Sequence, residues 1–161
     1  MTGADRPPCS SILIGASVDR VWCEVDRPGH LERFHPFCES NPTFAWTDGD
    51  RRDRISYFSG LVLDRTFTSW TPPHGFLLDI GTADGGPTNS VHWYFVSVAT
   101  DTTRATIAIH RMPGAPASSA GRESLEDYLD SVLLGLRHVV ERDEPVTRNQ
   151  FGSHPMFSPA A

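Results

Sequence analysis

The stretch that decides the fold is residues 11–37, SILIGASVDRVWCEVDRPGHLERFHPF. Its first five residues form a short extended run, which predicts a strand. Ser17 then stands where a helix N-cap is expected, so a helix is predicted to begin at about Val18. A Pro-Gly pair ends that helix, and a second short helix is predicted over residues 30–34 before the next proline. The order is therefore strand, helix, helix.

The residues that follow predict six more strands. Runs rich in Phe, Tyr, Trp, Val, Ile and Thr are separated by turns that contain Gly, Pro and Asp. The predicted strands are approximately 40–46, 52–59, 61–70, 76–81, 90–99 and 103–111. Because the connections between them are short, neighbouring strands should be antiparallel. The predicted sheet is a meander.

A long amphipathic helix is predicted near the C-terminus. Apolar residues recur at helical spacing from Leu125 to Val140, and Pro145 lies just beyond them. One helix over one face of a strongly curved seven-stranded sheet tends to leave space between the two. The expected fold class is therefore α+β, with a curved antiparallel sheet, two short helices and a long C-terminal helix that together enclose a cavity.

The domain organisation predicted from these patterns has three parts. Residues 1–10 are expected to be a flexible N-terminus, residues 11–144 a ligand-binding domain and residues 145–161 a C-terminal tail. The tail carries more aromatic residues than disordered termini usually do. It is therefore expected to fold back over the pocket or onto a partner subunit, with disorder as the alternative.

Composition excludes several classes of function. The chain has 161 residues, a net charge of -6 and 14 basic residues, all of which are Arg. This acidic balance argues against nucleic acid or anionic lipid as partners. The absence of Lys excludes Schiff-base aldolases, pyridoxal phosphate enzymes and P-loop NTPases, which need a lysine amine. The first apolar run is too short for a signal peptide or a membrane span, which predicts a cytoplasmic protein.

Cysteine and histidine spacing predicts neither a disulfide framework nor a metal site. The three cysteines are an odd number and form no CxxC pair. His30, His35 and Cys38 lie close together in the sequence, but no second half of a metal-binding motif follows. No metal is therefore expected.

The same residues resemble the START/SRPBCC superfamily, whose members share the helix-grip fold. The resemblance rests on Ile-x-Ala-Ser-Val-Asp-Arg-Val-Trp at 14–22 and on His-Leu-Glu-Arg-Phe-His-Pro-Phe at 30–37. Phe34 stands where many members have Trp, and the rest of the chain, to about Glu141, matches by the order of its elements. The resemblance implies a cavity for a hydrophobic molecule. Its enzymes mostly cyclise or dehydrate polyketide-like substrates without a cofactor, whereas other members are lipid carriers or interact with proteins.

Arg65 is the charged residue on the face of the sheet that is expected to point inward. A buried guanidinium needs a partner, because burying it alone costs several kcal/mol. One interpretation pairs Arg65 with Asp53 or extends it to the cavity mouth. A second makes it a ligand anchor or an enolate stabiliser. A register slip of one residue would instead turn Asp64 inward.

Tyr57 and His35 are the other candidate catalytic residues. The hydroxyl of Tyr57 could donate to a substrate carbonyl, or the ring could simply pack in the core. His35 could act as a general base near the cavity entrance, because the second helix lies there in the family that the chain resembles, or it could be a surface or capping residue. The expected ligand contacts are Phe34, Phe37, Leu63, Phe67, Phe76, Leu78, Trp93, Phe95, Ile107, Tyr128, Leu129, Val132 and Leu136.

Three functions remain open at this point. The first is a cofactor-independent cyclase or dehydratase for a polyketide-like or aromatic substrate, with Arg65, Tyr57 and His35 as its polar residues. The second is a non-catalytic carrier or sensor of a lipid-like ligand. The third is a protein-interaction module that uses the tail or the strand over residues 91–98, which is apolar on both faces and would suit a homodimer surface.

Overall fold

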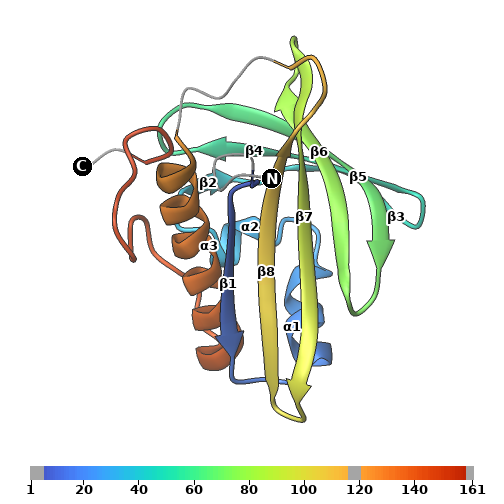
Figure 1. Ribbon diagram of the computed structural model, residues 1–161, viewed down its shortest axis with the longest axis vertical. Coiled ribbons are helices and arrows are strands. Elements are labelled where there is room, and N and C mark those ends of the chain that lie inside the picture. The colour runs from blue at the N-terminus through green and yellow to red at the C-terminus, as the bar shows by residue number, and fades with distance from the viewer. Residues whose placement is uncertain (1–5, 116–120, 159–161) are drawn as a thin grey trace.

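Within residues 6–115 and 121–158, which are the residues that the computed structural model describes, the chain forms eight strands and three helices (Figure 1). In chain order they are β1 (Cys9–Ile14), α1 (Val18–Val25), α2 (Leu31–Phe34), β2 (Cys38–Ser40), β3 (Thr43–Thr47), β4 (Asp50–Tyr57), β5 (Val62–Thr71), β6 (Gly75–Thr82), β7 (Gly86–Ala99), β8 (Thr102–Arg111) and α3 (Arg122–Arg142). The predicted order of elements is confirmed.

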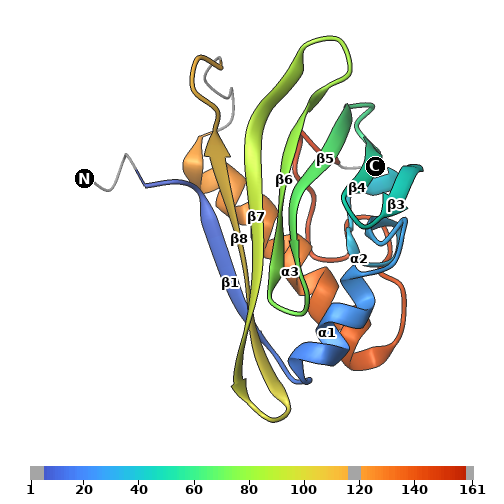
Figure 2. The same cartoon turned by 90° about the vertical axis from the view of Figure 1, so that its right-hand side faces the viewer.

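All strands belong to one antiparallel sheet. Its order is β1-β8-β7-β6-β5-β4-β2, and β3 also pairs with β4. The sheet curls around α3, which lies against its concave side, while α1 and α2 close one end (Figure 2). This is the α+β helix-grip fold that the sequence predicts.

The predicted strand at 40–46 is the main difference in secondary structure. It is divided into β2 and β3, which pair with consecutive parts of β4. Asn41 causes the break, because its buried side chain accepts a hydrogen bond from the backbone N–H of Leu31 and donates one to the carbonyl of Arg54. The next residue is Pro42, which has no N–H to donate to a sheet. Two short strands therefore occupy one edge.

The helix boundaries follow local chemistry. The Ser17 hydroxyl accepts a hydrogen bond from the backbone N–H of Arg20, as predicted for an N-cap. Strand β1 starts at Cys9, two residues before the expected start of order, and it pairs with β8. Residues 1–5 of the expected flexible N-terminus lie outside the described residues, as do residues 116–120 before α3.

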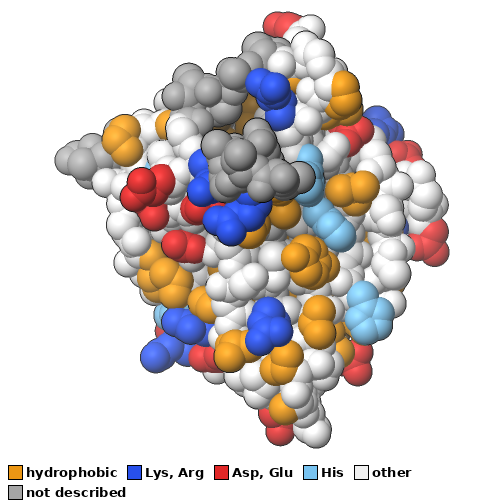
Figure 3. All heavy atoms as spheres, in the orientation of Figure 1, with side chains coloured by type: hydrophobic (Ala, Val, Ile, Leu, Met, Phe, Trp, Pro, Cys, Tyr) orange, Lys and Arg blue, Asp and Glu red, His pale blue; other side chains and the backbone are white. Residues whose placement is uncertain are grey.

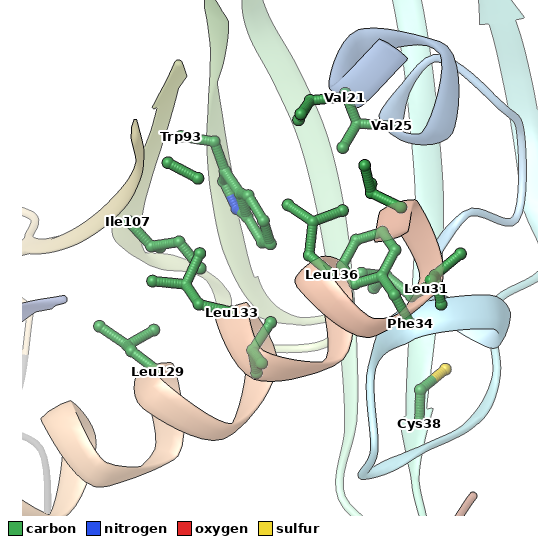
Figure 4. Packing of buried hydrophobic residues seen from close by; sticks show 14 of the residues in the cluster. Val21, Val25, Leu31, Phe34, Cys38, Trp93, Ile107, Leu129, Leu133 and Leu136 are labelled. Carbon is green, nitrogen blue, oxygen red and sulfur yellow. The ribbon is translucent and has the colours of Figure 1, made fainter. Parts of the chain in front are cut away.

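The core lies between the concave face of the sheet and α3. Leu129, Leu133 and Leu136 of α3 face Trp93 of β7 and Ile107 of β8, and Phe34 of α2 lies beside them (Figure 4). At Gly135 the helix touches the backbone of α2 so closely that a Cβ would overlap the carbonyl oxygen of Phe34. The long helix is therefore seated directly on α2, which fixes one wall of the interior.

The outer face of the sheet carries exposed apolar side chains (Figure 3). Leu13, Val96 and Val98 are 41% exposed or more, and Tyr94 is 37% exposed. His92 and His110 also point outward, as the strand parity predicts. Strand β7 thus has one buried and one exposed apolar face. A homodimer through this face stays a prediction.

Candidate functional site

A small, partly open cavity lies between α3 and the concave face of the sheet. Its volume is about 60 Å³, and most of its wall is aliphatic. The polar side chains that reach it are His35, Tyr57, Arg65 and Tyr128. The remaining lining residues are Leu31, Ile55, Leu78, Ile80, Val91, Trp93, Ile107, Ile109, Leu129 and Val132. All three candidate catalytic residues therefore meet at one cavity.

A larger surface hollow of about 330 Å³ lies on the outer side of the sheet. Its carboxylates already have partners, because Asp64 binds Arg54 and Asp79 accepts a hydrogen bond from Ser90. The cavity beneath α3 is the better candidate, since several buried polar groups converge on a largely apolar space there.

Arg65 and Asp53 form a buried ion pair at the cavity. They are direct partners in the β4–β5 register, and their side chains are 4% and 0% exposed. Nε and Nη2 of Arg65 each donate to one Asp53 carboxylate oxygen at 2.7 Å. Burial alone would raise the pKa of Asp53, but the charge and hydrogen bonds of Arg65 outweigh it and hold that pKa below its usual value. The paired interpretation of Arg65 is confirmed, and the register slip that would bury Asp64 is wrong.

His30 is a third member of this arrangement, and the sequence pattern did not predict its contact with Arg65. Its Nδ1 lies 2.6 Å from the carbonyl oxygen of Val25, which can only accept, so Nδ1 carries the proton. Nε2 therefore accepts a hydrogen bond from Nη2 of Arg65 at 2.9 Å. Burial, together with the charge of Arg65, lowers the pKa of His30 to about 3. The ring is therefore neutral and accepts from the guanidinium.

One nitrogen of Arg65 is left over. Nε and Nη2 are engaged by Asp53 and His30, whereas Nη1 makes no hydrogen bond to any residue in the described ranges. Because Arg65 lines the cavity, its Nη1 is a donor without a protein acceptor at the edge of an apolar space.

His35, Tyr128 and Tyr57 form a second buried polar group. Nε2 of His35 lies 2.8 Å from the Tyr128 hydroxyl, which lies 2.9 Å from the Tyr57 hydroxyl. Burial lowers the pKa of His35 to about 3 and raises that of Tyr57 to about 12. All three groups are therefore neutral near pH 7. His35 is not a surface residue, because it is 4% exposed, but it is the C-cap residue of α2, and its backbone N–H donates to the carbonyl of Leu31.

The C-terminal tail folds back beside this second group. The backbone N–H groups of Val146 and Asn149 donate to the carbonyls of Arg33 and Pro36, so the tail follows α2. Phe157 is 6% exposed and stacks on Tyr128, with 3.9 Å between ring centroids.

Two further contacts hold the end of the tail. The Ser59 N–H donates to the Phe157 carbonyl, and His154 Nε2 lies 3.2 Å from the Ser131 hydroxyl. The described part of the tail thus covers the outer side of the two tyrosines.

The predicted ligand contacts divide into two groups. Six line the cavity, namely Leu78, Trp93, Ile107, Tyr128, Leu129 and Val132. The others do not line it: Phe34, Phe37, Phe76, Phe95 and Leu136 are buried in the core, and Leu63 and Phe67 pack against it. Strand parity identified the inward face, but it could not show which inward side chains border the space.

The tryptophans are explained by packing. Trp22, Trp46 and Trp70 form one edge-to-face cluster, with centroid distances of 5.0 and 5.4 Å. The Arg51 guanidinium lies over Trp70 at 4.1 Å. Trp93 lies apart from them at the cavity, so the four do not form an aromatic cage.

Neither a metal-binding cluster nor a membrane-spanning helix is found in the described residues. No group of three or more His, Cys, Asp and Glu side chains within 6–115 and 121–158 is placed to hold a metal ion. Over the same residues, none of the helices has the length and apolar character needed to span a bilayer.

Comparison with known proteins identifies the fold alone. No protein-family model matches the chain, and no curated protein sequence matches it. An uncharacterized protein from Bacillus thuringiensis has a similar structure, with a TM-score of 0.66 and 15% identity over 83% of this chain and 97% of that one.

Two similar structures come from biosynthetic systems. DynU16, a protein of the dynemicin biosynthetic locus, has a TM-score of 0.66 and 20% identity over 90% of this chain and 52% of its own length. The di-domain aromatase/cyclase StfQ, from the steffimycin pathway, has a TM-score of 0.65 and 11% identity over 84% of this chain and 44% of its own length. The chain thus spans about half of each of these two proteins.

Proposed function

We propose that the protein binds a small hydrophobic molecule in the cavity, with Arg65 as its polar anchor, as a member of the START/SRPBCC superfamily. The observation that carries the proposal is the Nη1 of Arg65, a donor with no acceptor among the described residues, on a side chain that lines a mostly aliphatic cavity. This nitrogen is not among the fully buried side-chain atoms without a partner in the described residues, so it keeps accessible surface. A ligand oxygen that reaches it could therefore accept its hydrogen bond. The motifs at 14–22 and 30–37 and the structural similarity to StfQ and DynU16 support the same proposal.

The ligand has to enlarge the cavity when it binds. Sites for drug-sized ligands measure roughly 300–1,000 Å³, whereas this cavity measures about 60 Å³. The tail is the segment best placed to give way, because Phe157 packs on the two tyrosines from outside. We therefore expect binding to displace Phe157 from Tyr128.

The finer form of the proposal is catalysis of cyclisation or dehydration without a cofactor. In this form, Nη1 of Arg65 would stabilise an enolate oxygen, and a tyrosine hydroxyl would donate to a second oxygen. His35 suits a positioning role better than that of a general base. Its pKa of about 3 makes it a weak base near neutral pH, and both of its ring nitrogens already have partners.

Native mass spectrometry of the protein purified from its own host tests binding. We expect a retained small molecule, which denaturing extraction would identify. The matched variant is Arg65→Met with Asp53→Asn, which removes the anchor without leaving a buried carboxylate unpaired. It should fold and lose most of the retained molecule. If the wild-type protein is empty and binds no aromatic or acyl probe, the proposal is wrong.

The identified molecule then separates an enzyme from a carrier. A molecule that the wild-type protein converts to product, and that the double variant binds weakly without converting, would establish catalysis. Binding with no conversion would establish a carrier or sensor.

A further inference from the structure

The hydrogen bonds of the His35–Tyr128–Tyr57 chain have a defined starting point. The backbone N–H of Phe37 donates to Nδ1 of His35 at 3.2 Å. A neutral imidazole has one proton, so that proton is on Nε2, and it is donated to the Tyr128 hydroxyl oxygen. The direction of the first link therefore follows from the fold.

This hydrogen-bond chain contains one more donor than it has links. The chain has three donors, which are Nε2–H of His35 and the two tyrosine hydroxyls, but it contains only two links. Whichever tyrosine donates to the other, the remaining hydroxyl proton has no acceptor among these three residues. Both tyrosines line the cavity. One O–H donor is therefore available there, in addition to Nη1 of Arg65.

The charges at the cavity already cancel. The Arg65 guanidinium is neutralised by Asp53 through two hydrogen bonds, and His30 and His35 are neutral. A bound carboxylate would add a buried charge with no compensating partner, which is costly even when hydrogen-bonded. A bound cation would bring further donors to a wall that already has surplus donors.

We propose that the tyrosine hydroxyl at the end of this chain is a second anchoring point, and that with Arg65 it selects neutral ligands that carry a carbonyl oxygen over carboxylates, amidines and pure hydrocarbons. This inference rests on the proposed function, since it specifies the ligand class of the same cavity. It adds Tyr128 and Tyr57 as a donor pair and His35 as the positioning residue that orients them.

Four benzene derivatives of nearly equal size form a matched test. Acetophenone carries a neutral carbonyl, cumene replaces it with a hydrocarbon group, benzoate carries a negative charge and benzamidine a positive charge. Because the four are similar in volume, the cost of enlarging the cavity largely cancels in the ratio of their affinities. Titration followed by NMR of the Trp93 indole N–H, which lies at the cavity, gives the dissociation constants.

We expect acetophenone to bind about tenfold or more tightly than each of the other three. Tyr57→Phe combined with Tyr128→Phe should weaken acetophenone about five- to tenfold and leave cumene unchanged. The matched control is Tyr94→Phe, which alters the exposed tyrosine on the outer face and should change neither affinity.

The outcomes separate the inference from the proposed function. If cumene or benzoate binds as tightly as acetophenone, the cavity binds ligands but the proposed preference for neutral carbonyl compounds is wrong. If the double tyrosine variant binds acetophenone as tightly as the wild-type protein does, the tyrosine hydroxyl is not an anchoring point. If none of the four binds at millimolar concentration, the proposed function fails and this inference fails with it.

Discussion

Mild acid should destabilise this fold through two buried histidines. The pKa of both His30 and His35 is lowered to about 3 by burial, whereas an unfolded histidine has a pKa of about 6.5. Between these values the unfolded chain binds protons that the folded chain excludes. The free energy of unfolding is therefore highest above pH 6.5 and decreases as the pH falls.

The size of the effect follows from linkage. Each histidine changes the free energy of unfolding by about 1.4 kcal/mol per pH unit within this window. Lowering the pH from 7 to 5 should therefore cost about 2 kcal/mol for each ring, or about 4 kcal/mol for both. This is a large fraction of the roughly 5–15 kcal/mol that stabilises a typical domain. The pKa of Asp53 is held below its usual value by Arg65, so that carboxylate stays ionised between pH 7 and 5.

Urea unfolding followed by far-UV circular dichroism, at pH steps between 7 and 5, measures this loss. His30→Gln and His35→Gln each remove one titrating ring and keep an amide that can donate and accept. Each variant should show about half of the wild-type loss, even if its stability at pH 7 is lower. His92 and His154 remain as a common background, because burial lowers the pKa of both. A wild-type loss below about 1 kcal/mol, or an unchanged loss in the double variant, would refute the reasoning.

Three substitutions give further predictions. Gly135→Ala should prevent stable folding, because the added Cβ would overlap the Phe34 carbonyl oxygen. Thermal unfolding measures the loss of stability, and a melting temperature equal to that of the wild-type protein would contradict the close contact. Phe157→Ala should cost about 3 kcal/mol and speed proteolysis of the tail, whereas unchanged proteolysis would mean that the ring does not hold the tail. Asp53→Asn should cost about 3–5 kcal/mol, because it leaves a buried guanidinium without its carboxylate, and the same change at the more exposed Asp64 should cost under about 1 kcal/mol. If denaturant unfolding shows the same loss of stability for the two substitutions, burial does not determine how much each ion pair stabilises the fold.

The order of elements was predictable because local signals agree with the tertiary structure. Ser17 is the N-cap in the structure, and the apolar periodicity after residue 121 marks the buried face of α3. Alternation along β5 to β8 also identified inward side chains, including Arg65, and the need of a buried guanidinium for a partner pointed to Asp53 on β4.

Features that depend on contacts between distant elements could not be predicted. His30, the N-cap residue of α2, meets Arg65 of β5 through a contact between segments that are distant in the sequence, and helix α2 is too short for its periodicity to show that His35 is buried. The division of the strand at 40–46 depends on hydrogen bonds from Asn41 to α2 and β4. The cavity volume depends on how side chains from several elements fill the interior, which no single segment determines.

The contacts among His30, Asp53 and Arg65 also constrain how the sequence can evolve. Losing any one member leaves a buried charge or a buried polar nitrogen without its partner, so the first step of a replacement is costly and the changes are strongly coupled. The aliphatic residues of the cavity wall face no such barrier, because one side chain can exchange for another of similar volume at small cost. Descendants of this protein should therefore diversify the shape of the cavity readily, and hence the ligands they accept, while these three residues persist or disappear together.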